Sequence, residues 1–201
     1  MTSLDARTLA VETPSGPAYV ALSRRGRSGL FVVGHGAGGG IDAVDLVAVS
    51  TALAAAGWTV ARVVQPYRVK GHRAPERPPR LDAAWIAVID ALGKERTGKL
   101  VVSGRSSGAR VAVRTADEVG ADGAVALAYP LHPPGKPERS RAEEIEGLQT
   151  PLLVVQGARD AFGTAKELPA GTNVVEVPGD HSLKQDTAAV VAAVSSWIAE
   201  L

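Results

Sequence analysis

Gly104-Arg105-Ser106-Ser107-Gly108 is the motif that gives the strongest indication of the fold. A short apolar run at residues 100–103 precedes it, and an alanine-containing segment of helical length at residues 107–119 follows it. The pattern G-x-S-x-G between a strand and a helix is typical of a nucleophile elbow, a sharp turn that lifts a serine hydroxyl clear of a sheet. The turn also places that hydroxyl at a helix N-terminus, where unpaired N–H groups favour a developing negative charge. Ser106 is therefore the candidate nucleophile.

Two other interpretations of this motif stay open at this point. The chain has 22 glycines, so the motif can also be a glycine-rich turn in which a serine caps the helix. Ser107 is the rival nucleophile, but only Ser106 lies in the frame set by Gly104 and Gly108. We expect Ser107 to supply its backbone N–H instead.

The rest of the chain repeats the alternation seen around the elbow. Short runs rich in leucine or β-branched residues, each closed by glycine or proline, alternate with alanine-rich segments of helical length. This alternation predicts an α/β domain with a mainly parallel central sheet and helices on both faces. The predicted strands are residues 18–23, 30–34, 59–64, 100–103, 123–128, 152–156 and 173–177, and the predicted helices are residues 43–56, 81–92, 107–119, 141–147 and 186–200.

Composition fits this picture and narrows the function classes. The 201 residues suit one domain, 1–201, and 45% hydrophobic with 21% charged residues is typical of a soluble globular protein. Basic and acidic residues number 22 and 21, so the whole-chain charge predicts neither a nucleic-acid partner nor an anionic membrane. No cysteine is present, and neither a secretory leader nor a long apolar span is evident. We expect a cytoplasmic protein, and the sequence leaves the oligomeric state open.

A serine nucleophile needs a histidine to take its proton and a carboxylate to orient that histidine. Asp160 follows the predicted strand 152–156, and His181 follows the predicted strand 173–177. Each lies just past a strand, at the edge of the sheet that carries the elbow. Taken singly, Asp160 is an ordinary turn residue and His181 an ordinary loop histidine. With the elbow they predict a Ser106–His181–Asp160 triad, while Asp180 is the competing acid and is disfavoured because it neighbours His181.

The glycine-rich stretch at residues 34–40 follows the second predicted strand and exposes its backbone. Such a loop donates an N–H to an oxyanion, and the second donor is the residue after the nucleophile. We assign these two donors to Ala37 and Ser107. A phosphate-binding loop is the alternative, and it is disfavoured because no nucleotide-binding motif follows. His35 is expected to be structural, and nothing in the sequence requires a metal or an organic cofactor.

With these motifs in place, the chain resembles the α/β-hydrolases, which implies a compact α/β-hydrolase fold. More narrowly it resembles the KANSL3/Tex30 group, which is related to dienelactone hydrolase-like proteins. The resemblance spans most of residues 34–182, and its most distinctive block is Tyr129-Pro130-Leu131-His132-Pro133-Pro134-Gly135-Lys136-Pro137. The other matching stretches are residues 34–38, 65–67, 104–110, 156–163 and 179–182.

The chain departs from the usual pattern of that group at three positions. Ser107 and Ala109 stand where the group usually has methionine and glycine, and Ala161 stands where it usually has proline. Both elbow glycines are intact. Eukaryotic relatives in the group serve in a chromatin-associated complex.

The expected substrate is a small soluble ester or thioester, because only about twenty residues separate Tyr129 from Thr150, where many hydrolases insert a cap domain. Tyr67, Arg105 and His132 are the candidate substrate-binding residues. Six basic residues and one acidic residue lie between positions 62 and 80, which suits a carboxylate-bearing substrate, although a solvated loop is the favoured interpretation. Two function classes remain: a serine hydrolase that forms an acyl-enzyme, and a non-catalytic binding or scaffold protein on the same fold.

Overall fold

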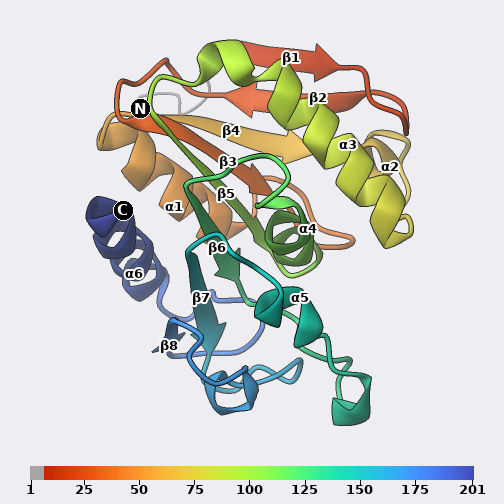
Figure 1. The fold of residues 1–201 in the computed structure, drawn as a ribbon, viewed down its shortest axis with the longest axis vertical. Helices are drawn as coiled ribbons and strands as arrows, with labels where there is room; N and C mark the ends of the chain where they lie inside the picture. Colours follow the sequence, from red (N-terminus) through yellow and green to blue (C-terminus); the bar gives the residue numbers. More distant parts are fainter. Residues whose placement is uncertain (1–6) are drawn as a thin grey trace.

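An eight-stranded sheet runs through the centre of the molecule in the order β1-β2-β4-β3-β5-β6-β7-β8 (Figure 1). The computed structural model describes residues 7–201. Strands β3 to β8 all run parallel to one another, whereas β2 pairs antiparallel with both β1 and β4. The strands are β1 (Arg7–Val11), β2 (Ala18–Leu22), β3 (Gly29–Gly34), β4 (Trp58–Val64), β5 (Lys99–Arg105), β6 (Gly123–Leu127), β7 (Leu152–Gly157) and β8 (Val174–Val177).

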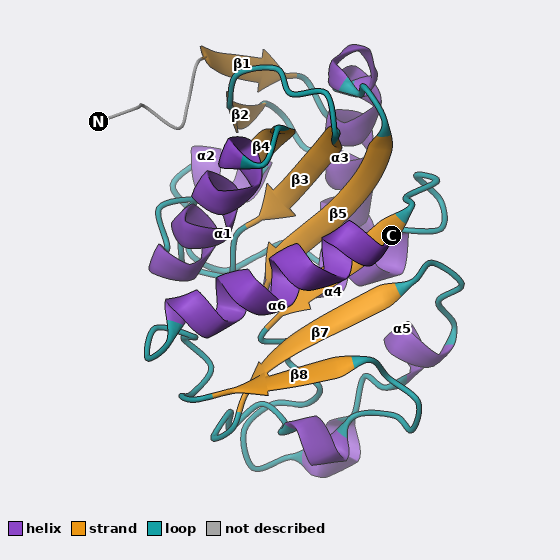
Figure 2. Ribbon diagram, turned by 90° about the vertical axis from the view of Figure 1, so that its left-hand side faces the viewer, coloured by secondary structure: helices purple, strands orange, loops and turns teal. Residues whose placement is uncertain are grey.

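Helices cover both faces of this sheet. Helices α1 (Val44–Ala55) and α6 (Thr187–Glu200) pack side by side on one face, as Figure 2 shows. Helices α3 (Pro78–Ala91) and α4 (Ser107–Thr115) lie on the other, with the single-turn helix α5 (Glu143–Glu146) beside α4. The shorter elements are α2 (Pro66–Val69) and three 3₁₀ turns, η1 (Gly93–Glu95), η2 (Pro137–Arg139) and η3 (Ala165–Glu167).

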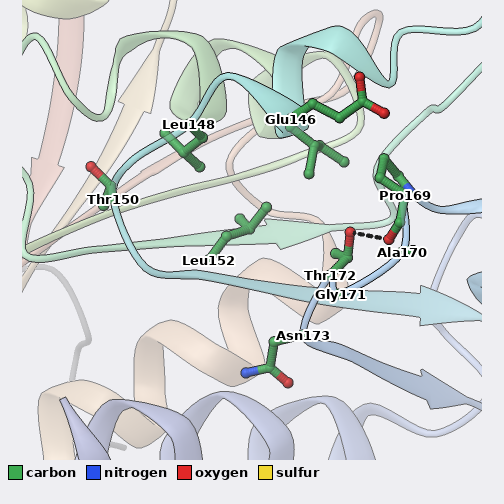
Figure 3. A pocket seen from close by; sticks show the side chains of 10 residues that line it. Glu146, Leu148, Thr150, Leu152, Pro169, Ala170, Gly171, Thr172 and Asn173 are labelled. Atoms are coloured by element: carbon green, nitrogen blue, oxygen red, sulfur yellow. Dashed lines mark hydrogen bonds between the residues drawn. The ribbon is translucent and has the colours of Figure 1, made fainter.

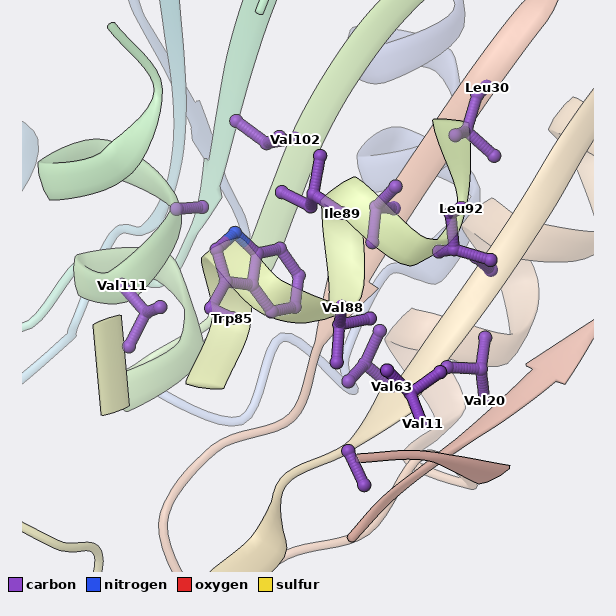
Figure 4. Close-up of a cluster of buried hydrophobic side chains, with 14 of the residues drawn as sticks. Val11, Val20, Leu30, Val63, Trp85, Val88, Ile89, Leu92, Val102 and Val111 are labelled. Atoms are coloured by element: carbon purple, nitrogen blue, oxygen red, sulfur yellow. The ribbon is translucent and has the colours of Figure 1, made fainter. Parts of the chain in front are cut away.

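The two helical layers bury separate apolar clusters against the sheet. On the α3 side Trp85 is only 1% exposed and lies among Val88, Ile89 and Val102 (Figure 4). On the other side, residues of α1 and α6 pack on the opposite faces of the central strands. Every residue of β3 is buried. This explains why the central strands have continuous apolar runs rather than alternating ones.

The predicted α/β architecture is confirmed, with differences at its margins. All seven predicted strands are present to within one or two residues, but β1 was not predicted. It is a mostly exposed edge strand, so it has no continuous apolar run in the sequence. Helix α4 ends at Thr115 rather than at residue 119, and α5 is one turn rather than the predicted seven residues. Helix α2 begins at Pro66, between the predicted strand 59–64 and the predicted helix 81–92, where no helix was predicted.

The topology brings the loops that follow β3, β5, β7 and β8 to one edge of the sheet, since these strands are parallel. The connection from β6 to β7 holds only η2 and α5, so no cap domain covers that edge. Within residues 7–201 we find no helix with the length and apolar character needed to span a bilayer.

Candidate active site

Ser106 occupies a strained turn between β5 and α4. Its φ of 53° and ψ of −114° lie in a region that side chains with a Cβ rarely adopt. The turn packs so tightly that a Cβ at Gly104 would lie 2.3 Å from the carbonyl carbon of Gly108. A Cβ at Gly108 would lie 2.7 Å from the carbonyl oxygen of His35. Backbone therefore occupies the space beside both glycines, which explains the G-x-S-x-G spacing.

Ser106, His181 and Asp160 form a continuous chain of hydrogen bonds. The Ser106 Oγ lies 2.8 Å from His181 Nε2, and His181 Nδ1 lies 2.8 Å from Asp160 Oδ2. The Asp160 side chain is fully buried, while the His181 side chain is 20% exposed. The imidazole thus lies between a hydroxyl at the surface and a carboxylate in the interior, although 75 residues separate His181 from Ser106.

Backbone contacts align the two loops that carry Asp160 and His181. The Arg159 N–H donates to the Gly179 carbonyl at 2.9 Å. A Cβ at Gly157 would lie 2.5 Å from the Asp180 carbonyl oxygen, so the loops approach backbone to backbone. The Phe162 ring stacks on the His181 ring, with 4.1 Å between the ring centres. The sequence carries no signal for this stacking, because it depends on how two separate loops meet.

The carboxylate of Asp180, the competing acid, forms its hydrogen bonds with Ser182. Its Oδ1 accepts hydrogen bonds from the Ser182 N–H at 2.8 Å and from the Ser182 hydroxyl. These bonds hold the pKa of the Asp180 carboxyl below its ordinary value. Asp180 therefore shapes the turn that presents His181.

His35 fixes the backbone of the glycine-rich loop that follows β3. Its Nδ1 lies 2.9 Å from the Gly36 carbonyl oxygen, and its Nε2 accepts from the Gln65 N–H at 3.1 Å. Burial lowers the pKa of His35, so the ring is neutral with its proton on Nδ1. All described peptide bonds are trans, and the Ala37 N–H therefore points away from the Gly36 carbonyl that His35 holds.

The two candidate oxyanion donors are both available. Ser107 is the first residue of α4, so its N–H has no partner within the helix. Neither the Ala37 nor the Ser107 N–H makes an intramolecular hydrogen bond in the described chain. A Cβ at Gly36 would lie 3.4 Å from the Ser106 Cβ, so this loop packs directly on the elbow.

Arg105 is held by protein groups on two sides. Its Nε lies 3.2 Å from Asp45 Oδ2, and its Nη2 donates to the His181 carbonyl at 3.0 Å. Asp45 lies in the first turn of α1 and is 1% exposed. Burial raises the pKa of its carboxyl, and the Arg105 charge opposes that rise. Arg105 therefore links α1, the elbow and the loop of His181.

The other two candidate substrate-binding residues, Tyr67 and His132, are both buried. Tyr67 is 2% exposed and packs against the His35 ring at 5.7 Å between ring centres. His132 Nδ1 lies 2.9 Å from the Pro133 carbonyl oxygen, and its Nε2 lies 3.2 Å from Glu167 Oε1. Tyr67 also lines the small cavity beside the elbow with Ser107, whereas the His132 ring contacts Pro133 and Glu167. The substrate-binding role of both residues stays a prediction.

Two cavities differ in place and size. One of about 400 Å³ lies where β7 and β8 begin, between α5 and the loop before β8 (Figure 3). This is the opposite edge of the sheet from Ser106, so it belongs to a different part of the surface. The cavity beside the elbow, lined by His35, Ser107 and Trp85 among others, has a volume of only about 10 Å³. That is room for about one water molecule.

Comparisons with solved structures agree with this architecture. XC6422 from Xanthomonas campestris, an α/β serine hydrolase without a lid, superposes with a TM-score of 0.74 at 22% identity, covering 96% of this chain and 95% of that one. Est1E from Butyrivibrio proteoclasticus with ferulic acid bound gives 0.79 at 17% identity, covering 96% and 98%. Dienelactone hydrolase from Anabaena variabilis gives 0.75 at 17% identity, covering 96% of each chain.

Sequence comparison leads to the same family. No curated protein matches the chain. The family described as the alpha/beta hydrolase domain matches residues 27–196, which includes the elbow, the glycine-rich loop and the loops of Asp160 and His181. The chain belongs to the alpha/beta hydrolase family and has a hydrolase fold without a lid.

Proposed function

We propose that this hydrolase is a serine esterase or thioesterase that acts on small soluble acyl substrates through an acyl-enzyme. The observation that carries the proposal is the pair of 2.8 Å contacts that join Ser106 Oγ to His181 and His181 to Asp160. A hydroxyl hydrogen-bonded to an imidazole, which is itself oriented by a buried carboxylate, is the arrangement that activates a serine.

In the first half-reaction, Ser106 Oγ attacks the acyl carbonyl while His181 Nε2 takes the hydroxyl proton. Asp160 holds the His181 Nδ1–H and stabilises the imidazolium. The Ala37 and Ser107 N–H groups donate to the oxyanion. The intermediate then breaks its bond to the alcohol or thiol, which leaves with the proton from His181.

In the second half-reaction a water molecule attacks the acyl-enzyme. His181 takes a proton from that water, and the second tetrahedral intermediate releases a carboxylic acid and returns the proton to Ser106. This cycle needs no metal or organic cofactor.

Size selectivity follows from the surroundings of Ser106. No cap domain covers the site, and the cavity beside the elbow is about 10 Å³ in volume. Within the described residues 7–201, this cavity is too small for a long acyl chain, so most of the apolar surface of such a chain would stay in water. The neighbours described as a dienelactone hydrolase and as an esterase domain support an ester substrate. The Tyr129–Pro137 block supports membership of the KANSL3/Tex30 group.

The proposal is tested with p-nitrophenyl esters from acetate to decanoate. We expect turnover that is highest for the shortest chains and that is lost in Ser106→Ala, with an unchanged melting temperature. Residual activity of Ser106→Ala equal to that of the wild type would exclude Ser106 as the nucleophile. A folded wild-type protein without turnover on any ester would favour the non-catalytic binding or scaffold function.

A further inference from the structure

Gln156 is a fully buried amide within an apolar strand. It follows Leu152, Leu153, Val154 and Val155 along β7, and its exposure is 0%. An amide group costs free energy to bury unless its donors and acceptor are all paired. Its partners therefore reveal why a glutamine stands here.

The Gln156 side chain joins three parts of the active-site edge. Its Oε1 accepts from the Tyr129 N–H at 2.9 Å. Its Nε2 donates to the Gly163 carbonyl at 2.6 Å, to Asp160 Oδ2 at 3.0 Å and to the Tyr129 carbonyl at 3.2 Å. The end of β6, the acid Asp160 and the loop beyond it thus meet at one side chain.

The contact with Asp160 falls on the oxygen that faces the histidine. Asp160 Oδ2 accepts from both Gln156 Nε2 and His181 Nδ1, while Oδ1 accepts from the Phe162 N–H at 2.8 Å. Two donors that take no part in proton transfer therefore fix the plane of this carboxylate. Rotation of the carboxylate about its Cβ–Cγ bond would break both bonds, so its orientation toward His181 is set before substrate binds.

We propose that Gln156 is a positioning residue for catalysis, which acts through Asp160 by orienting the carboxylate and stabilising its ionised form. The proposal rests on the proposed serine-hydrolase function. It goes beyond that function because turnover then depends on Gln156, a buried residue four positions before Asp160, in addition to the three residues of the triad. A purely structural role would instead make Gln156 matter for stability alone.

Two substitutions separate these roles. Gln156→Met keeps the length of the side chain and removes every hydrogen bond. We expect kcat for p-nitrophenyl acetate, expressed per Ser106 titrated with a fluorophosphonate, to fall about 10- to 100-fold, because hydrogen bonds to charged groups contribute about that factor. KM should change little, since Gln156 is fully buried and has no exposed surface with which to touch the substrate.

Gln156→Glu adds a readout that stability does not affect. Its carboxyl keeps an acceptor for the Tyr129 N–H but places a second carboxyl about 3 Å from Asp160, so the two carboxyls share one proton at neutral pH. That proton replaces the lost N–H donor, and activity is retained while it is bound. Loss of the proton at higher pH leaves two repelling carboxylates. We expect a descending alkaline limb in kcat that the wild type lacks.

Other titratable groups near Gln156 are engaged with different partners. The His132 ring pairs with Glu167. The Tyr129 hydroxyl donates to the Glu144 carboxylate at 2.8 Å. His132 and Glu167 are unchanged in both variants, so a limb that appears only in Gln156→Glu belongs to the new carboxyl pair.

Thr115→Val is the matched control, because Thr115 is 1% exposed and its hydroxyl bonds only within α4, to the Val111 carbonyl. It should lower the melting temperature and leave titrated kcat unchanged. If Gln156→Met does not fold, the pH profile of Gln156→Glu alone decides whether Gln156 acts through Asp160. Titrated kcat within twofold of wild type in Gln156→Met, or no new limb in Gln156→Glu, overturns the inference. A wild type that takes no fluorophosphonate overturns the proposed function itself.

Discussion

At the scale of single residues, the active site depends on a backbone conformation at Ser106 that is energetically unfavourable by itself. Ser106 has a φ of 53°, and the glycines on either side of it leave no space for a Cβ. Such strain persists only where the surroundings hold it, and it is common at functional sites. The Ser106 N–H donates to the Leu127 carbonyl at 2.9 Å, which is one of the contacts that hold the turn.

Ser106→Gly should therefore stabilise the protein while it removes the nucleophile. Glycine adopts positive φ without steric cost, so relief of the strain should contribute about 1 kcal/mol or more to the free energy of unfolding. For a chain of this length that raises the melting temperature by about 2–4 °C. Calorimetry of the wild type, Ser106→Gly and Ser106→Ala measures the three melting temperatures. A melting temperature of Ser106→Gly below that of Ser106→Ala would contradict the prediction.

Backbone atoms occupy the space beside both glycines of the elbow, so a side chain at either position should destabilise the protein. Gly108→Ala places a Cβ 2.7 Å from the His35 carbonyl, and backbone cannot yield there as a flexible side chain can. We expect a loss of about 1–3 kcal/mol or more in unfolding free energy, as overpacking typically costs. Gly93→Ala is the control, since its Cβ meets nothing within 4 Å. Equal urea midpoints for the two variants would show that the elbow tolerates a Cβ.

At the scale of elements, ion pairs tie together loops that the sheet alone would leave independent. Arg105 joins the elbow to Asp45 of α1 and to the His181 carbonyl. Near β6, the His132 ring reaches Glu167 in η3, in the segment that follows Asp160. Arg105 thus connects the elbow to α1 and to the loop of His181, and the His132–Glu167 pair connects the loop after β6 to the segment after Asp160.

Arg105→Gln should destabilise the protein because it leaves the buried Asp45 carboxylate without its cation. The cost should stay below the roughly 3–5 kcal/mol of breaking a fully buried pair, because Arg105 is 18% exposed. Adding Asp45→Asn should recover part of it. A double-mutant cycle from urea unfolding measures the coupling, and additive effects of the two substitutions would show that the pair contributes nothing.

The His132–Glu167 pair predicts a pH-dependent stability. The Pro133 carbonyl and then the Glu167 carboxylate raise the pKa of His132, while burial opposes the rise. A raised folded-state pKa stabilises the fold fully below the unfolded value near 6.5, and the contribution is lost as pH rises through the folded value. The melting temperature of wild type should therefore exceed that of His132→Gln most at pH 5.5–6, by a margin that shrinks toward pH 9. A margin independent of pH would contradict this.

At the scale of the whole molecule, one mixed sheet between two helical layers carries the site on its carboxyl edge. Much of this is predictable from the sequence, because buried parallel strands such as β3 and β7 have apolar runs closed by glycine. The edge strand β1 is not, because its exposed residues have no such pattern. The order of Ser106, Asp160 and His181 predicted which side chains the structure would bring together, while their catalytic roles stay a prediction.

Other parts of the site depend on contacts that no local pattern encodes. Gln156 appears in the sequence as one polar residue at the end of an apolar run. No neighbouring pattern predicts that its side chain bonds to Tyr129, Gly163 and Asp160. The same holds for the Phe162 ring on His181 and for Asp45 beside Arg105. Gln156 and Tyr129 lie 27 residues apart, and Phe162 with His181 and Asp45 with Arg105 are also distant in sequence, so these pairs meet only because parallel strands bring their loops to one edge.

The proposed function requires Ser106 to be an activated nucleophile, which is tested by the intact mass of the protein after exposure to a fluorophosphonate. We predict a single covalent adduct on the wild type, none on Ser106→Ala, and much slower labelling of Asp160→Asn at an unchanged fold. Absence of an adduct on folded wild-type protein, or an adduct that persists in Ser106→Ala, would show that Ser106 is not an activated nucleophile.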